Sequence, residues 1–392
     1  MGRLLPEVFE IAPRPRWRHE SERVASAIAR RWRRWFPGHR WTPPSRTSDL
    51  PFRVTGFEPP FDELEAIVTH PRVLREIEEE PANDLVVDLP APRFPTGFES
   101  LGWTSRTNPA PVYDVIPFAL ELDVLEMRLA ELETVVDRFV VVECERAFSG
   151  IRKPLFFDRN KKRFQRFLPK IEHVILDAAP IDAANASRIR RTRGFEGEEI
   201  PRAHLWRSVV SRIPFERDAV IIWSDVDEIP SRDFVHLMRH FAPPGPIRLV
   251  APALRYRFDL FDEEATNHIV FARGTDLPYL DRHPEGFRAM HGTLVHARRS
   301  VHLTSFFGPL GLVAKFALAT EWPEGLVPFI RNEHDETAAM IAEGSWFGRP
   351  AEVYDPEADP RGVVPLIARA NRGRYARYWA DSRSMSRAAH RA

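Results

Sequence analysis

Two carboxylates one residue apart, Asp225 and Asp227, directly follow an apolar run and are well suited to phosphate chemistry. The run, residues 220–223, is typical of a strand buried on both faces at the centre of a parallel sheet. Because ligand crevices open at the carboxyl ends of such strands, both side chains are predicted to line a pocket. Carboxylates this close repel each other, and Mg²⁺ or Mn²⁺ bound between them and a phosphate relieves that repulsion. The pair therefore indicates chemistry on a nucleoside diphosphate.

The elements that would position this pair alternate between strand and helix patterns from residue 111 onward. Strands are predicted at residues 112–118, 138–143, 171–176 and 220–223. Helices are predicted between them at residues 120–132, 160–167 and 203–213. Beyond residue 230 we expect a short helix to residue 240 and strands at residues 247–258, 268–272 and 292–303. This order predicts an α/β fold with right-handed βαβ crossovers and a mostly parallel, Rossmann-type sheet flanked by helices.

Residues 1–110 differ in composition from the rest and are predicted to form a mainly helical or irregular accessory region. Residues 20–36 suit a basic helix packed on the main domain, and peripheral contact with an anionic membrane or nucleic acid is the alternative. A second helical stretch is interrupted at Pro71. The main domain is placed at residues 111–350, followed by a basic, helical tail at residues 351–392.

Charge and composition limit the possible classes of function. The 392 residues contain 56 Lys plus Arg and 56 Asp plus Glu, so no overall field favours nucleic acid as a partner. The single cysteine, Cys144, excludes an intramolecular disulfide and a multi-cysteine zinc site, and its apolar surroundings favour an inert core thiol. No transmembrane span or signal peptide is evident, so a cytoplasmic protein is expected.

Several common catalytic patterns are missing from the sequence. There is no G-x-G-x-x-G after a strand, no P-loop, no H-E-x-x-H and no G-x-S-x-G. Dinucleotide dehydrogenases, P-loop enzymes, zincins and ordinary serine hydrolases are therefore disfavoured.

Four blocks of sequence are informative when they are read in order. The first is VYDVIPFALELDVLEMRLAEL at residues 112–132, and the second begins with FVVVECERAFSG at residues 139–150 and continues with KPLFF. The third is SDVDEIP at residues 224–230, and the weaker fourth is VHLTSFFG at residues 301–308, followed by Lys315. Together these blocks resemble glycosyltransferase family 17, the family of the β-1,4-mannosyl-glycoprotein β-1,4-N-acetylglucosaminyltransferases. The resemblance covers roughly residues 111–322.

This resemblance implies a GT-A-like fold, a UDP-sugar donor, expected to be UDP-N-acetylglucosamine, and inverting transfer to a glycan or other hydroxyl acceptor. Asp225 and Asp227 would hold the Mn²⁺ or Mg²⁺ ion, which stabilises the departing diphosphate. His302 would complete the metal site, although a histidine near a strand end can also be structural. Glu228 would take part in catalysis or face the start of the following helix.

Four further residues are candidates for binding the donor. Asp114 and Glu143 belong to the first two predicted strands, where they would accept hydrogen bonds from the nucleoside or be buried carboxylates satisfied by backbone N–H groups. Arg202 and Lys315 would bind phosphate oxygens or remain solvated surface charges.

The general base required for inversion is left open by the sequence. Its candidates lie downstream of the carboxylate pair, at Asp259, Asp262, Glu263, Asp281, Glu285 and Glu321. Two other functions also remain open. A nucleotidyltransferase would use the same paired carboxylates to attack phosphorus, and a non-catalytic carbohydrate-binding protein would not use them for chemistry.

Overall fold

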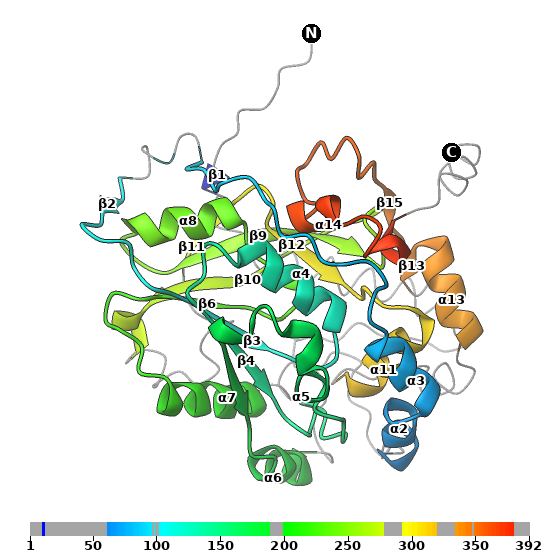
Figure 1. Cartoon of the computed structure of the whole chain (residues 1–392). Coiled ribbons are helices and arrows are strands. Elements are labelled where there is room, and N and C mark those ends of the chain that lie inside the picture. The colour runs from blue at the N-terminus through cyan, green and yellow to red at the C-terminus, as the bar shows by residue number, and fades with distance from the viewer. Residues whose placement is uncertain are drawn as a thin grey trace, which may run out of the picture.

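A large mixed sheet with helices on both faces gives this chain an α/β fold (Figure 1). The computed structural model describes residues 10–11, 61–95, 98, 102–188, 199–277, 292–319, 334–346 and 349–379. The basic helix predicted at residues 20–36 lies outside the described residues.

The first half of the sheet is parallel and contains the strands predicted around the carboxylate pair. Its order is β6–β3–β4–β5, formed by Val220–Trp223, Val112–Pro117, Arg138–Glu143 and Ile171–Ile175. The register places Asp114 of β3 between Phe139 of β4 and Ile222 of β6. The four predicted strands are therefore confirmed.

Helices connect these strands, although one predicted helix is wrong. The segment at residues 160–167 is not a continuous helix but follows α5 with short 3₁₀ turns, because the Asn160 side chain donates to the Phe156 carbonyl and ends α5 there. An additional helix, α6, precedes α7. The bounds are α4 Leu122–Leu132, α5 Phe156–Arg159, η3 Lys161–Phe164, η4 Leu168–Lys170, α6 Ala179–Arg188 and α7 Glu199–Arg212.

The second half makes the sheet mixed rather than mostly parallel. β9 (Ile247–Arg255) and β10 (Leu260–Arg273) form an antiparallel hairpin, and β10 is also antiparallel to β6. The hairpin turn contains Tyr256 in a left-handed conformation, with φ of 64°. The strand predicted at residues 292–303 is two strands, β11 (Thr293–His296) and β12 (Val301–Thr304), separated by a turn at Arg299, where φ is 69°. Both are parallel to β9.

The remaining elements are mostly short, and they either extend this sheet or lie around it. The helix interrupted at Pro71 is confirmed as two helices, α2 (Phe61–Val68) and α3 (Pro71–Glu78), which pack on α11. The other helices are α8 Arg232–His240, α11 Pro309–Leu318, α13 His334–Glu343, α14 Leu366–Ala370, η6 Gly274–Asp276 and η7 Ala376–Tyr378. The other strands are β1 Glu10–Ile11, β2 Thr104–Ser105, β7 Glu228–Ile229, β8 Phe241–Ala242, β13 Ser345–Trp346, β14 Arg349–Pro350 and β15 Glu352–Val353.

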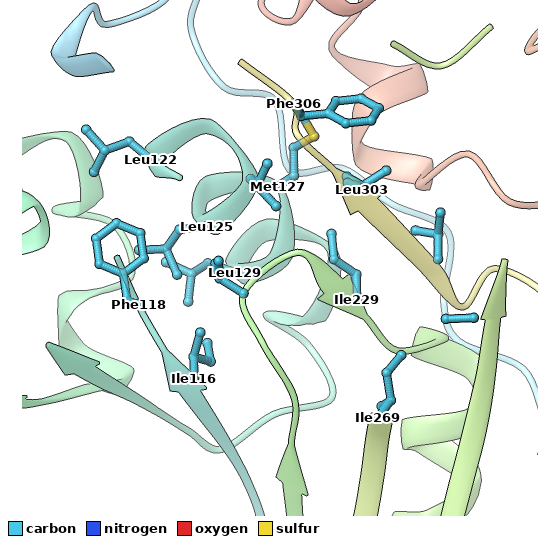
Figure 2. Close-up of a cluster of buried hydrophobic side chains, with 14 of the residues drawn as sticks. Ile116, Phe118, Leu122, Leu125, Met127, Leu129, Ile229, Ile269, Leu303 and Phe306 are labelled. Atoms are coloured by element: carbon cyan, nitrogen blue, oxygen red, sulfur yellow. The ribbon is translucent and has the colours of Figure 1, made fainter. Parts of the chain in front are cut away.

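Side-chain alternation along the strands produces a hydrophobic core on each face of the sheet. In β3, Val112 and Ile116 face the core under α4 and α8, whereas Tyr113 and Val115 face the core under α7. Figure 2 shows the first core, where Leu125 of α4 lies near Phe118, just after β3, and Met127 of α4 lies near Leu303 of β12. By the same alternation, Asp114 points toward α4. A charged strand residue is thus directed into an otherwise apolar layer.

The outer side of α4 is covered by the C-terminal segment. Glu126 of α4 accepts hydrogen bonds from Arg374, from the Tyr375 hydroxyl at 2.9 Å and from Arg163 at 3.0 Å. Burial alone would raise the pKa of Glu126, but these partners hold it below the ordinary value. The Tyr378 hydroxyl similarly donates to Asp123.

Among the described helices, none is long and apolar enough to cross a membrane.

Replacing Glu126 by alanine is predicted to destabilise the protein by about 3–5 kcal/mol, because Arg163 and Arg374 would stay buried without their shared carboxylate. Urea denaturation followed by circular dichroism measures this change. Glu133→Ala is the control: its partner Arg166 is 54% exposed, so a loss of only about 0–1 kcal/mol is expected. Equal losses for the two variants would contradict a structural role for the buried network.

Candidate active site

The Asp225–Asp227 loop is fixed by backbone pairing at both of its ends. It leaves β6 at Trp223 and enters β7, which pairs antiparallel with β12 so that Glu228 lies opposite His302. The amide of Leu303 also donates to the Asp227 carbonyl at 2.7 Å. The loop is therefore clamped between the parallel half of the sheet and β12.

Arg128 of α4 organises the loop from beneath. Its guanidinium makes a two-pronged ion pair with Asp114, at 2.9 and 2.6 Å, and both side chains are fully buried. The same group donates to the backbone carbonyls of Asp225 at 2.6 Å and Glu228 at 3.1 Å, and to the Ser224 hydroxyl at 2.9 Å. Its N–H groups are thus shared between a strand carboxylate and the loop, so the loop conformation depends on one buried cation.

Asp227 lies among cationic and imidazole partners. Its carboxylate contacts the Lys315 ammonium of α11 at 3.0 Å and His302 Nε2 at 3.4 Å. Burial alone would raise the pKa of Asp227, but the charge of Lys315 and the contact with His302 lower it well below the ordinary range. Burial alone would lower the pKa of His302. The negative charge of Asp227 more than offsets this effect, so the pKa of His302 is raised. Lys315 also contacts Glu121 at 3.4 Å, so it joins two carboxylates.

Asp225 is paired with a different cation. Arg202 of α7 donates to both of its carboxylate oxygens, at 2.8 and 3.1 Å. The guanidinium also lies 5.0 Å from the centre of the Phe148 ring. Asp225 is 26% exposed, so this pair is at the surface of the site and open to exchange with a ligand.

Glu228 turns away from solvent and supports the loop. One of its oxygens accepts from the Asp225 amide at 3.1 Å, and the other lies 3.2 Å from His268 Nδ1. His268 belongs to β10, on the opposite side of β6 from β3. The carboxylate therefore joins the loop to a neighbouring imidazole.

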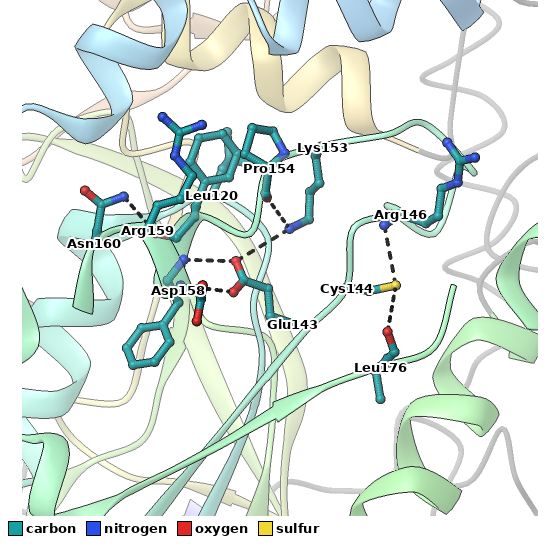
Figure 3. A network of polar contacts seen from close by, with 12 residues as sticks. Leu120, Glu143, Cys144, Arg146, Lys153, Pro154, Asp158, Arg159, Asn160 and Leu176 are labelled. Atoms are coloured by element: carbon teal, nitrogen blue, oxygen red, sulfur yellow. Dashed lines mark hydrogen bonds and ion pairs between the residues drawn. The ribbon is translucent and has the colours of Figure 1, made fainter. Parts of the chain in front are cut away.

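Glu143, at the end of β4, is separately enclosed by protein partners (Figure 3). It accepts from the amides of Phe157 at 2.9 Å and Asp158 at 3.3 Å, and it contacts the Lys153 ammonium at 3.8 Å. Asp114 is likewise occupied, because Arg128 donates a hydrogen bond to each of its carboxylate oxygens. The donor contacts proposed for these two carboxylates remain predictions. Cys144 nearby is buried, and burial raises the pKa of its thiol.

The side chains at the loop are of types that bind divalent cations, but they are not arranged as a metal site. Two carboxylates and an imidazole are ligands that Mn²⁺ accepts. Within the described part of the chain, however, no three His, Cys, Asp or Glu side chains are grouped closely enough to hold a metal ion. Arg202 and Lys315 occupy the positions next to the carboxylates, so metal binding requires at least Asp225 to exchange its partner.

The candidates for the general base fall into two groups. Asp259 is paired with Arg257 and Asp262 with Arg255, both in or next to the β9–β10 hairpin. Asp281, Glu285 and Glu321 lie outside the described residues, as does the side chain of Glu263.

Comparison with known proteins identifies the segment that contains this loop. Residues 95–266 match the model of glycosyltransferase family 17. Residues 95–266 therefore belong to glycosyltransferase family 17. The family resemblance predicted from the sequence blocks is confirmed over this region, which includes Asp114, Glu143, Arg202 and the carboxylate loop. His302 and Lys315 lie beyond the matched residues.

Three curated relatives align with this chain over 137 residues. Each is a β-1,4-mannosyl-glycoprotein 4-β-N-acetylglucosaminyltransferase. The rat and human proteins are 34% identical and the mouse protein is 33% identical. The alignment covers 34% of this chain and 24% of each relative, so the chain spans about a quarter of the length of the curated relatives it matches.

Sequence reasoning missed three residues that the structure brings to the loop. Arg128 is the basic residue of a helix in which every residue is buried, and its place among leucines and three acidic residues could have marked it as a buried ion-pair partner. Glu121, just before this helix, is joined to the site through Lys315. His268 is brought to Glu228 by the antiparallel β10, which the expected parallel order did not include.

Replacing Arg128 by methionine is predicted to cost about 3–5 kcal/mol of folding stability, because Asp114 would remain buried and charged without a partner. Guanidinium denaturation followed by tryptophan fluorescence reports this loss. Adding Asp114→Asn should recover part of the stability but not the loop order, since the loop carbonyls still lack their donor. Arg166→Met, at an exposed pair, is the control. A change below about 1 kcal/mol for Arg128→Met would contradict its role as the anchor of the loop.

Proposed function

We propose that this chain is an inverting glycosyltransferase that transfers N-acetylglucosamine from UDP-N-acetylglucosamine to a glycan or other hydroxyl acceptor. The observation that carries the proposal is the family 17 segment whose Asp225–Asp227 loop is held at the carboxyl end of β6 by Arg128. The activity for which the curated relatives are named supports N-acetylglucosamine as the transferred sugar.

A GT-A-like fold is part of the same proposal. The parallel order β6–β3–β4–β5, with the loop at the carboxyl end of β6, is the type of half-sheet that binds nucleotides at its switch point. The antiparallel β10 then separates this donor half from β9, β11 and β12, which we assign to acceptor binding.

The cationic groups around the loop suit the charge that develops during transfer. The bond between the anomeric carbon and the diphosphate breaks, and negative charge grows on the leaving diphosphate. Arg202 offers a planar fork for phosphate oxygens, and Lys315 offers a point charge. In this structure the Arg202 guanidinium lies 2.8 Å from an oxygen of Asp225, and the Lys315 ammonium lies 3.0 Å from an oxygen of Asp227. We propose that they exchange a carboxylate for a donor phosphate.

Asp225, Asp227 and His302 are the residues proposed to hold Mn²⁺ or Mg²⁺. When bound, the ion would supply Lewis-acid stabilisation of the diphosphate. His302 Nε2 already lies 3.4 Å from a carboxylate oxygen of Asp227. We propose that Asp225 becomes the third ligand when its ion pair with Arg202 breaks. Metal binding and release of Arg202 are thus proposed to be one coupled event.

The proposed activity predicts release of UDP when the protein is given UDP-N-acetylglucosamine, an acceptor panel and Mn²⁺. Asp225→Asn and Asp227→Asn should each lower the transfer rate by about 100-fold or more, because each removes charge that positions the cations of the site. Asp218→Asn is the matched control, since this exposed aspartate lies at the opposite end of β6. Release of UMP or pyrophosphate would instead identify nucleotidyl transfer, and no release from any nucleotide sugar would exclude the proposed function.

Arg202→Gln is predicted to tighten Mn²⁺ binding by about two- to fivefold in the absence of donor, because Asp225 loses a partially exposed ion-pair partner that competes with the metal. The same variant should raise KM for the donor, since a phosphate partner is lost. Titration calorimetry or the paramagnetic resonance of Mn²⁺ measures the first effect. Arg207→Gln, at an exposed position of the same helix, should change neither value. Weaker Mn²⁺ binding by Arg202→Gln would remove Asp225 from the proposed ligand set.

A further inference from the structure

His268 and Glu228 form a histidine–carboxylate pair beside the Asp225–Asp227 loop. Nδ1 of His268 lies 3.2 Å from a carboxylate oxygen of Glu228. An ionised carboxylate only accepts hydrogen bonds, so in the neutral ring the proton is on Nδ1 and Nε2 keeps its lone pair. The imidazole is 32% exposed, whereas the Glu228 side chain is 2% exposed. The pair thus has a buried acidic end and an imidazole end that a ligand can reach.

The sheet register places this imidazole at the site. β10 is antiparallel to β6, and Val270 pairs with Trp223. β6 ends at Trp223, and the same register continued into the loop would bring His268 level with Asp225. Glu228 completes the link, because its other oxygen accepts the Asp225 amide at 3.1 Å. One carboxylate therefore fixes both the loop backbone and the ring.

We propose that His268 is the general base of the transfer and that Glu228 is the positioning residue that orients its ring; this rests on the proposed function. Nε2 takes the proton of the acceptor hydroxyl, and the hydroxyl oxygen forms a bond to the anomeric carbon. The bond from that carbon to the diphosphate oxygen breaks, and its electron pair stays on the nucleoside diphosphate. The proton ends on His268, and Glu228 stabilises the resulting imidazolium.

The other described candidates near the loop are less suited to accept this proton. Asp259 and Asp262 are each engaged in an ion pair with an arginine, which a proton acceptor would first have to give up. Glu121 contacts the ammonium of Lys315, and His302 is directed at Asp227. Within the part of the chain that the structure describes, His268 combines an orienting carboxylate with an exposed ring and no paired cation.

His268→Gln is expected to lower kcat for sugar transfer by about 10²–10⁴-fold while leaving the dissociation constant for UDP within about twofold of wild type. The matched control is His70→Gln, an exposed histidine just before α3 and outside the sheet. For His268→Ala, added imidazole should restore part of the transfer rate, because a free base can occupy the vacated space. A purely structural histidine would not give this rescue.

Glu228→Gln tests the orienting role. The glutamine carbonyl can still accept the Asp225 amide, but its NH₂ group would face Nδ1 and favour the tautomer with the proton on Nε2, which cannot act as a base. The rate should therefore fall, and adding Glu228→Gln to His268→Gln should cost little more, since the two residues act as one unit.

The outcomes separate this proposal from the proposed function. If wild type releases UDP with an acceptor but His268→Gln retains transfer within about twofold, or imidazole fails to rescue His268→Ala, the base assignment is overturned and the glycosyltransferase activity stands. If additive losses occur in the double variant, Glu228 does not act through His268. If wild type transfers no sugar from any nucleotide donor, the proposed function itself fails.

Discussion

The buried ion pair between Arg128 and Asp114 is the constraint on which the rest of the site depends. Removing two charges from water costs several kcal/mol per ion, and a single salt bridge recovers this only with excellent geometry and further hydrogen bonds. Arg128 meets that condition because its remaining N–H groups bind loop carbonyls and Ser224. The loop consequently cannot relax without leaving a cation unsatisfied in the core. A charge that is costly to bury thereby holds the loop in one conformation.

Above this anchor, the carboxylates of the site already have partners before any ligand arrives. Asp225 and Asp227 are matched by Arg202 and Lys315, and Glu121 and Glu228 are held by Lys315 and His268. A diphosphate entering such a site meets cations that already have partners. The diphosphate must therefore displace carboxylates from these cations rather than enter an empty positive pocket. Such an exchange favours a diphosphate that is bound to a metal cation, because the cation can pair with the displaced carboxylates.

The sequence could predict the parallel half of the fold because its signals are local. Apolar runs at residues 112–117, 138–143 and 220–223 are strands, and the Leu pattern of α4 is a helix. The family resemblance was also predictable, because it depends on short blocks read in order. The mixed second half was not, since the antiparallel course of β10 is set by a tight turn at Tyr256 and by long-range pairing with β6.

Within the site, residue types were easier to predict than residue partners. Asp225, Asp227, Arg202, Lys315 and His302 do come together, yet periodicity could not show that Asp114 is paired with Arg128 or that Glu143 is enclosed by α5. Those pairings join segments far apart in the chain. His268 illustrates the same limit, because only the register of two antiparallel strands brings it to Glu228.

The covering of α4 by residues 374–378 has a consequence for the order of events during synthesis. Ribosomes release a chain from its N-terminus, so Glu126 and Asp123 emerge long before Arg374, Tyr375 and Tyr378. Until residues 374–378 appear, Glu126 and Asp123 can pair with Arg163 but lack the hydrogen bonds from Arg374 and the two tyrosine hydroxyls. The packing around the helix that carries Arg128 is therefore completed only after residues 374–378 have been synthesised, well after the carboxylate loop that this helix holds.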